Sequence, residues 1–148
     1  MRGFVVGVLF AMGIIAWTLE LAFYTTHKSW WPRETPNGPF EELVLRVWDV
    51  YVFFDPIFDQ PPLWLKVMCW IEVLVFGPLY FISAYALKSR APWARSVVLP
   101  FAGALLYSTI VYFALELGSE RVPGTNDLVV LVVNLPWTLL PIVLFFVV

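Results

Sequence analysis

Apolar residues gather in four long stretches that are separated by short polar segments. They cover residues 3–24, 61–87, 92–117 and 127–148, and the third can also begin at Ser96. A helix needs about 20 apolar residues to cross roughly 30 Å of hydrocarbon, and each stretch reaches that length. The pattern therefore predicts an all-α membrane protein, a bundle of four transmembrane helices.

The first stretch has an alternative interpretation, because Arg2 precedes an apolar run as it does in a signal peptide. Glu20 lies near the end of the run, and no small-residue cleavage site follows it before Trp30. We therefore expect this stretch to be a transmembrane helix.

Residues 25–61 form the only long polar segment. Pro32 and Pro36 predict that its first half is irregular. In residues 40–54, apolar side chains recur at three- and four-residue spacing, with charged side chains mostly on the other side. This spacing predicts a short amphipathic helix that lies at the membrane interface or caps the bundle. Its apolar positions are Leu43, Val44, Val47, Val50, Tyr51 and Phe54.

The composition agrees with a membrane protein. Hydrophobic residues make up 61% of the chain and charged residues 14%, whereas an ordinary globular domain has about 45–50% and about 25%. Because the net charge is −2 and there is no basic run, we expect no nucleic-acid partner. The length of 148 residues predicts a single domain, 1–148.

The basic residues suggest an orientation. With four spans, both termini share one side of the membrane with the short link 88–95. That side carries Arg2, Lys88, Arg90 and Arg95 in short segments, and basic residues of short loops favour the cytoplasmic side. We therefore expect cytoplasmic termini.

Three of the apolar stretches contain a carboxyl group, at Glu20, Glu72 and Glu116. An acidic group at membrane depth is expensive and usually faces the interior of the bundle, so each indicates a functional site. Glu20 and Glu116 have an alternative, because they lie near the ends of their stretches and could reach water. For Glu72, which is deeper, the alternative is a protonated acid bonded to a neighbouring helix.

Each stretch also has one polar stripe at helical spacing. Because lipid cannot satisfy polar atoms, the stripes are expected to face one another. Asp55, just before the second stretch, is a site candidate or a turn and capping residue. Trp137 could be plain core packing, and Asn134 could join helices. With one histidine and one cysteine we expect no metal site. The stripes contain Trp17, Glu20 and Tyr24; Cys69, Glu72 and Phe76; Thr109, Tyr112 and Glu116; and Asn134, Trp137, Thr138 and Pro141.

The second stretch and its approach resemble the sigma-2 receptor of the EXPERA superfamily. The similar residues are Asp55-Pro-Ile-Phe-Asp-Gln-Pro-Pro-Leu-Trp-Leu-Lys, Ile71-Glu72, Gly77-Pro78 and Ala84-Tyr85-Ala86. The superfamily also contains emopamil-binding protein, the sterol Δ8–Δ7 isomerase. The resemblance implies a bundle of four core helices around a lipid-accessible sterol pocket.

The third and fourth stretches resemble the isomerase at least as much. Tyr107-Ser-Thr-Ile-Val-Tyr112-Phe113-Ala-Leu-Glu116 and Asn134-Leu-Pro-Trp137 follow its spacing, and Glu20 falls at its first-span glutamate. Three positions depart from it. The isomerase histidine is Ala16 here, an aspartate is Thr109, and Glu72 keeps the sigma-2 spacing. The chain thus combines both patterns.

The resemblance implies two functions. The first is an isomerase that moves a double bond in a sterol or related terpenoid, with Glu72 and Glu20 as proton carriers and Trp137 stabilising a carbocation. Three further residues would orient these groups or relay protons between them: Asn134, Thr109 and Tyr112. The second is a non-catalytic protein that binds sterols and cationic amines. A purely structural subunit is disfavoured by the polar stripes. The remaining predicted ligand-binding residues are Asp55, Tyr107, Glu116, Trp17, Tyr24, Phe76 and Cys69.

The expected partners are a hydrophobic small molecule, the lipid bilayer and a second copy of the chain in a homodimer. No cofactor is expected, since proton transfer needs none. The expected location is the endoplasmic-reticulum membrane in a eukaryote or the plasma membrane in a bacterium.

Overall fold

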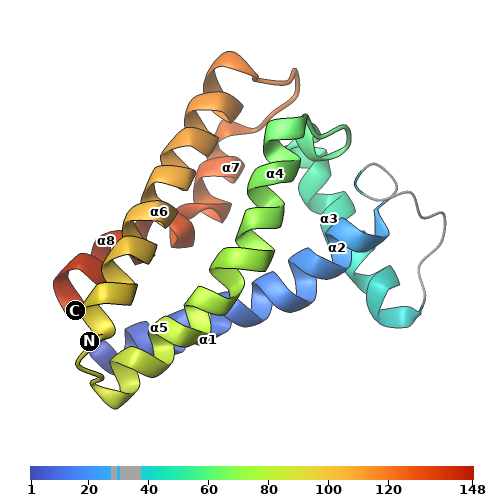
Figure 1. Cartoon of the computed structure of the whole chain (residues 1–148). Coiled ribbons are helices and arrows are strands. Elements are labelled where there is room, and N and C mark those ends of the chain that lie inside the picture. The colour runs from blue at the N-terminus through green and yellow to red at the C-terminus, as the bar shows by residue number, and fades with distance from the viewer. Residues whose placement is uncertain (28–29, 31–37) are drawn as a thin grey trace.

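The computed structural model is a bundle of long helices (Figure 1) and describes residues 1–27, 30 and 38–148. The prediction of an irregular segment around Pro32 and Pro36 lies outside these residues. No strand occurs in the described part of the chain. The prediction of an all-α chain is therefore confirmed.

Three continuous helical rods are long and apolar enough to cross a membrane. The first, Arg2–Thr26, comprises α1 (Arg2–Ile15), η1 (Ala16–Glu20) and α2 (Leu21–Thr26). The second, Leu63–Ser89, comprises α4 (Leu63–Ile71), η3 (Glu72–Phe76) and α5 (Gly77–Ser89). The third, Ala94–Ser119, comprises α6 (Ala94–Ala114) and η4 (Leu115–Ser119). These rods coincide with the first three predicted stretches.

The fourth predicted stretch forms two helices, so the described residues contain a fourth span only if this bent pair crosses the membrane as one. The two helices are α7 (Asp127–Val133) and α8 (Leu135–Val147), which meet at Asn134 with a bend of 42°. Pro136 explains the break, because its ring lacks an N–H and collides with the carbonyl of Val132 in a continuous helix. The Asn134 side chain caps the broken turn by donating to the Val130 carbonyl at 2.9 Å.

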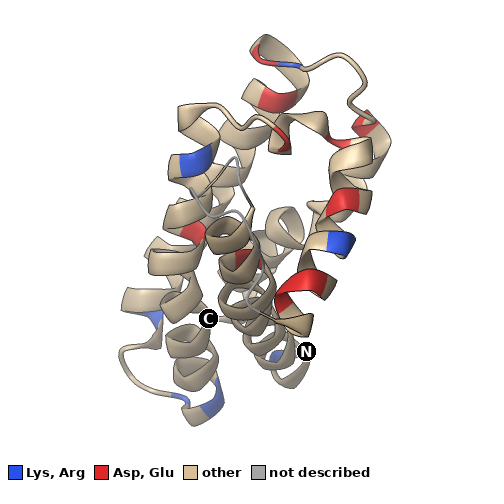
Figure 2. Ribbon diagram, turned by 90° about the vertical axis from the view of Figure 1, so that its right-hand side faces the viewer, with Lys and Arg blue, Asp and Glu red and all other residues tan. Residues whose placement is uncertain are grey.

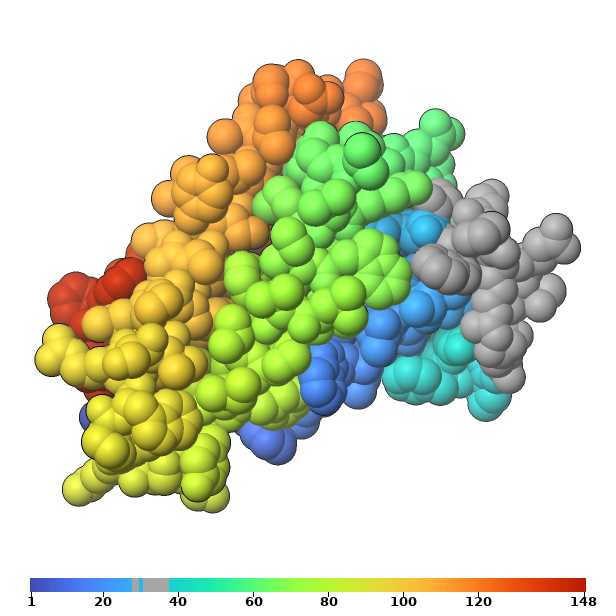
Figure 3. All heavy atoms as spheres, in the orientation of Figure 1, coloured from blue at the N-terminus to red at the C-terminus, as the bar shows by residue number. Residues whose placement is uncertain are grey.

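The bundle is closed at the end that carries both termini. There α1 packs along α5, and α6 packs along α8. The Arg2 guanidinium donates to the Val147 carbonyl at 3.1 Å, which ties the two ends of the chain together. Side chains of α5 and of the beginning of α6 meet at this end (Figure 3). Its apolar core includes Leu9, Tyr80 and Leu144, all fully buried.

At the other end the rods diverge, and α3 (Pro39–Phe54) packs against α2. Aromatic rings fasten it, with Phe23 and Trp48 stacked at 4.3 Å between ring centres. The short turn η2 (Pro56–Phe58) then leads to α4. The helix predicted over residues 40–54 is thus confirmed.

The apolar side chains of α3 point in two directions, which the sequence prediction had placed on one face. Val44 is buried, and Trp48 and Tyr51 are partly buried. A second apolar row is exposed on the outside of the molecule, and it contains Phe40, Leu43, Val47, Val50 and Phe53. A helix with one apolar row toward protein and another toward the surroundings suits a position at the membrane interface.

Trp17 joins the first two rods at their π-helical turns. Pro78 has no N–H, so the Val73 carbonyl lacks the partner that a π-helical turn would supply. The Trp17 indole N–H donates to this carbonyl at 2.9 Å. The indole also lies directly over Gly77, where an added Cβ would be 2.7 Å from Trp17 Cδ1 and would overlap Nε1.

We therefore expect Gly77→Ala to destabilise the protein by about 1–3 kcal/mol, because the methyl group displaces the Trp17 ring from a close-packed contact. Thermal unfolding of purified protein in detergent measures the effect. Gly103→Ala is the matched control, since a Cβ at Gly103 meets nothing within 4 Å. Equal melting temperatures for the two variants would contradict the prediction.

Candidate functional site

A cavity of about 310 Å³ lies where α3 meets the three rods and the junction of α7 and α8. Pockets that bind small molecules measure about 300–1,000 Å³ and are mostly apolar with a few polar groups. Apolar side chains such as Leu65, Met68 and Leu105 form much of the wall. The polar and ionisable lining residues are Glu20, Tyr24, Tyr51, Cys69, Glu72, Ser108, Thr109, Tyr112, Asn134 and Trp137.

All three intramembrane glutamates lie in π-helical turns. Glu20 is the last residue of η1, Glu72 is the first residue of η3, and Glu116 is the second residue of η4. A π-helical turn inserts an extra residue into a helix and occurs frequently at functional sites. The regular 3.6-residue period used for the sequence prediction contains no signal for such a turn.

Glu72 is held from two sides at one end of the cavity. The Tyr80 hydroxyl donates to Glu72 Oε1 at 2.7 Å, and the Trp137 indole N–H donates to the same oxygen at 2.9 Å. Sequence reasoning missed Tyr80, which follows Glu72 by eight residues. In a regular helix, the residue seven positions after Glu72 would lie on the same face of the helix as Glu72. The π-helical turn η3 contains one extra residue, so the residue eight positions after Glu72, which is Tyr80, lies on that face instead.

Glu20 reaches the same cavity from the first rod. Its side chain is 6% exposed, and Oε2 has no hydrogen-bond partner among the residues that the structure describes. The Glu20 and Glu72 carboxyl groups interact electrostatically. The structure therefore places Glu20 and Glu72, from separate rods, on the wall of one mostly apolar cavity.

A second polar cluster lies at the end of α3. The Tyr51 and Tyr112 hydroxyls donate to Asp55 Oδ2 at 2.8 and 3.2 Å. The Asn134 amide approaches the Tyr51 hydroxyl at 3.5 Å. Burial raises the pKa of Asp55 above its usual value, and the hydrogen bonds from Tyr51 and Tyr112 oppose this effect only in part. Burial likewise raises the pKa of Tyr51, which sequence reasoning did not include in the site.

A family model matches residues 43–148 of the chain, and it describes EXPERA, the expanded EBP superfamily. The chain belongs to the EXPERA superfamily. The superfamily includes sterol isomerases and sigma-2 receptor-like binders. No curated protein and no solved structure matches the chain. Together with its apolar helices, the membership makes this a multi-pass integral membrane protein. The matched residues of the EXPERA domain supply Glu72, Trp137 and Asn134, while Glu20 comes from the segment before them.

Other predicted residues of this EXPERA chain line the cavity or support it. Tyr24 and Cys69 contribute to the wall. The Thr109 hydroxyl bonds the Leu105 carbonyl at 2.9 Å and the Trp137 carbonyl at 3.2 Å, so it joins α6 to α8 beside Trp137. Asp55 lies behind the wall and reaches the cavity through Tyr51 and Tyr112.

Four predicted ligand-binding residues lie away from the cavity of this EXPERA domain. Tyr107 is 72% exposed because it is two residues from both Leu105 and Thr109, which face inward, and so it falls on the opposite side of α6. Trp17 is 48% exposed and bonds Val73 instead. The other two are buried elsewhere: Phe76 belongs to the core at the terminal end, and Glu116 packs beside Asp55.

Proposed function

We propose that the protein is an intramembrane isomerase that moves a carbon–carbon double bond in a sterol or related terpenoid. The observation that carries this proposal is the facing arrangement of Glu20 and Glu72 in one apolar cavity, with Trp137 bonded to Glu72. Two acid–base groups and an aromatic surface are what such a reaction needs.

The reaction conserves protons. A carboxylic acid gives its proton to one alkene carbon, and the π electrons form the new C–H bond. The carbocation that results forms at the neighbouring carbon. A carboxylate then removes a proton from the next carbon, and the electrons of that C–H bond form the new double bond. No metal or redox group takes part in these steps.

The hydrogen bonds support different roles for the two glutamates. Hydrogen bonds from Tyr80 and Trp137 to Glu72 Oε1 stabilise the carboxylate form of Glu72. Glu20 Oε2, buried without a donor in the described part of the chain, suits a carboxylic acid. Glu20 is therefore the proton donor and Glu72 the acceptor, and return of the proton from Glu72 to Glu20 after product formation restores the starting state for the next turnover.

Trp137 supplies the surface against which the cation forms. Its ring lines the cavity, and its N–H fixes it to Glu72. A desolvated indole face stabilises a cation by about 2 kcal/mol or more without bonding to it covalently. The surrounding apolar side chains exclude water, which would otherwise capture the carbocation.

A second candidate is a non-catalytic binder of sterols and cationic amines, like the sigma-2 receptor. The observation that favours it is the unpaired Glu20 Oε2, since an ammonium group that entered the cavity would satisfy this oxygen. Such amines also mimic a carbocation, so their binding alone does not separate the two candidates.

Product analysis separates them. Membranes that contain the protein are incubated with a Δ8-sterol in heavy water, followed by a panel of other sterols and terpenoids. Deuterium in a product with a shifted double bond supports the isomerase. Tight sterol binding with no turnover across the panel supports the binder and contradicts the isomerase.

We further propose that α7 and α8 together form a fourth span and that both termini face the cytoplasm. Arg2 and the link with Lys88, Arg90 and Arg95 lie at the same end of the bundle, and acidic residues are prominent in the other half (Figure 2). We expect reporter domains fused to either terminus to be protected from protease added to the outside of sealed cells. Cleavage of one fused terminus only would contradict an even number of spans. A homodimer and the membrane compartment stay predictions.

A further inference from the structure

Two buried carboxyl groups have no part in the proposed reaction. Asp55 lies between α3 and η2, Glu116 lies in η4, and both are fully buried. Their carboxyl groups are within hydrogen-bonding reach of each other, and neither lines the cavity directly. We call Asp55 and Glu116 the buried acid pair.

Three of the four carboxyl oxygen atoms of the buried acid pair lack hydrogen-bond donors among the residues that the structure describes. Asp55 Oδ2 accepts the two tyrosine hydroxyls, whereas Asp55 Oδ1 and both Glu116 oxygens accept nothing within the part of the chain that the structure describes. Two buried carboxylates side by side would repel each other, and each would lack solvation. One proton between them removes the repulsion, converts the contact into a strong hydrogen bond and supplies one of the missing donors.

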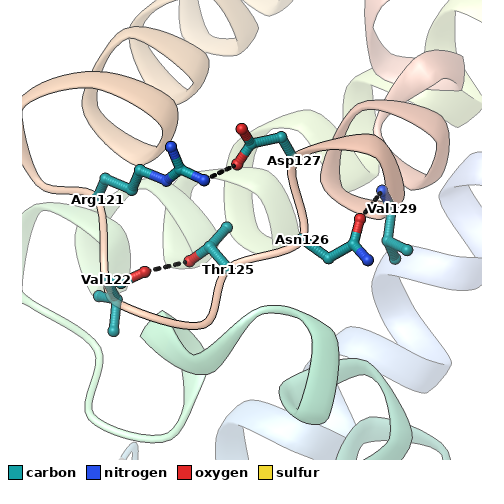
Figure 4. Close-up of polar contacts among 6 residues, drawn as sticks. All are labelled: Arg121, Val122, Thr125, Asn126, Asp127 and Val129. Carbon is teal, nitrogen blue, oxygen red and sulfur yellow. Dashed lines mark hydrogen bonds and ion pairs between the residues drawn. The ribbon is translucent and has the colours of Figure 1, made fainter.

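The loop between η4 and α7 lies next to the buried acid pair, and polar contacts within it hold its shape (Figure 4). The Asn126 backbone N–H donates to the Phe54 carbonyl at 2.8 Å, so the loop is fixed to the end of α3. Thr125, next to Glu116, is buried and donates its hydroxyl to the Val122 carbonyl at 2.9 Å. The loop is further braced by the ion pair between Arg121 and Asp127 at 2.8 Å. Water therefore has little access to replace a lost hydrogen bond of the pair.

From this geometry we infer that Asp55 and Glu116 share one proton, and that Glu116 is a positioning residue which orients the Asp55 carboxyl so that Tyr51 and Tyr112 are held on the cavity wall. Glu116 interacts with the Asp55 carboxyl group, and the two tyrosines bond Asp55 Oδ2. Asn134 extends the arrangement to the bend between α7 and α8. This inference rests on the proposed function in one respect, namely that the cavity binds the ligand.

The stability that the buried acid pair contributes is expected to decrease as the pH rises. The pKa of Asp55 is raised in the folded protein, so the stability that its proton contributes is complete at acidic pH and is lost as the pH rises through the folded value. The ionisable groups that face the pair are Tyr51, Tyr112 and Asp127, and none of them is basic. The full-length protein is therefore expected to lose sterol binding on the alkaline side.

The test compares Glu116→Gln with Glu116→Ala in the purified full-length chain, using a Δ8-sterol and a lipophilic tertiary amine as binding probes at several pH values. The Gln amide can donate to Asp55 in place of the shared proton. We expect Glu116→Gln to bind within about threefold of the native protein and to lose the alkaline decline, and Glu116→Ala to bind about tenfold or more weakly. The carbonyl infrared absorption of protonated carboxyl groups should be weaker in Glu116→Gln than in the native protein, with the part that belongs to Glu20 retained in both.

Native binding by Glu116→Ala overturns the inference, and so does equal loss in both variants. If Glu116→Ala does not fold, two measurements on Glu116→Gln still test the inference: its sterol binding at alkaline pH and its infrared absorption. An unchanged absorption in that variant overturns the shared proton. None of these measurements needs turnover, so an absent isomerase activity leaves their result readable.

Discussion

The variant Glu72→Gln is expected to lose about 10²–10⁴-fold in turnover of its sterol or terpenoid substrate. The amide keeps the size of the side chain, and its oxygen can still accept the hydrogen bonds from Tyr80 and Trp137. It cannot take up the proton that leaves the substrate. The loss should therefore appear in kcat with little change in KM, which steady-state kinetics with the purified protein measures.

The matched control is Glu120→Gln, an exposed glutamate in the turn after η4 that is far from the cavity lining. It should retain native kinetics. Glu20→Gln should lose turnover to a similar extent, because the amide has no acidic proton to give. The double variant should be little worse than either single one, since both groups serve one proton cycle. Full activity in Glu72→Gln would remove Glu72 from the reaction.

The same variants separate the two candidate functions. In a non-catalytic binder, Glu20→Gln and Glu72→Gln remove a negative charge, so they should weaken binding of a cationic amine more than binding of a neutral sterol. In an isomerase they should in addition stop product formation. Affinity for both probes, measured beside turnover, distinguishes these outcomes.

Much of the fold followed from hydrophobic length alone. Three rods coincide with predicted stretches, and the amphipathic helix over residues 40–54 is present as α3. The lipid environment makes this possible, since any polar backbone at that depth must be paired within a helix. The site followed in part from the same argument. Glu20, Glu72, Trp137, Asn134 and Thr109 all line one cavity because polar side chains on separate spans have no other favourable direction.

The features that the sequence could not predict depend on local departures from a regular helix. The π-helical turns at Glu20, Glu72 and Glu116 shift every later side chain around its rod, which is why Tyr80 was missed. Pro136 indicates the bend at Asn134, but the mean hydropathy of a long window is nearly unchanged by a single proline, so the apolar stretch still reads as one helix. For Tyr107, a motif match placed the residue in the site, whereas the helical period places it on the outside.

The polar groups of this cavity form two clusters with different chemistry. In the first, Glu20 and Glu72 come together beside Trp137, and both are ionisable. In the second, the neutral hydroxyls of Tyr51 and Tyr112 belong to the cavity wall and bond Asp55 of the buried acid pair. A mostly apolar ligand that places its reactive double bond at the first cluster would thus meet only neutral groups at the second.

Trp137→Leu is expected to lower turnover by about 10²–10³-fold, because it removes two interactions at once. The ring face stabilises a desolvated cation by about 2 kcal/mol or more. The indole N–H also donates to Glu72 Oε1 at 2.9 Å, and a hydrogen bond to a charged group contributes about 1.5–3 kcal/mol. Trp137→Phe keeps an aromatic face but loses the donor, so we expect it to fall about tenfold and to lie between the native protein and Trp137→Leu.

Steady-state turnover of the three proteins, beside their affinity for a neutral sterol and a cationic amine, tests this order. The neutral sterol should bind nearly as well to all three, while the amine should follow the order of turnover, since it resembles the carbocation. Trp93→Leu is the matched control, because Trp93 is at the start of α6 and away from the cavity lining. Equal turnover in Trp137→Phe and Trp137→Leu would show that the indole donor matters and the ring face does not.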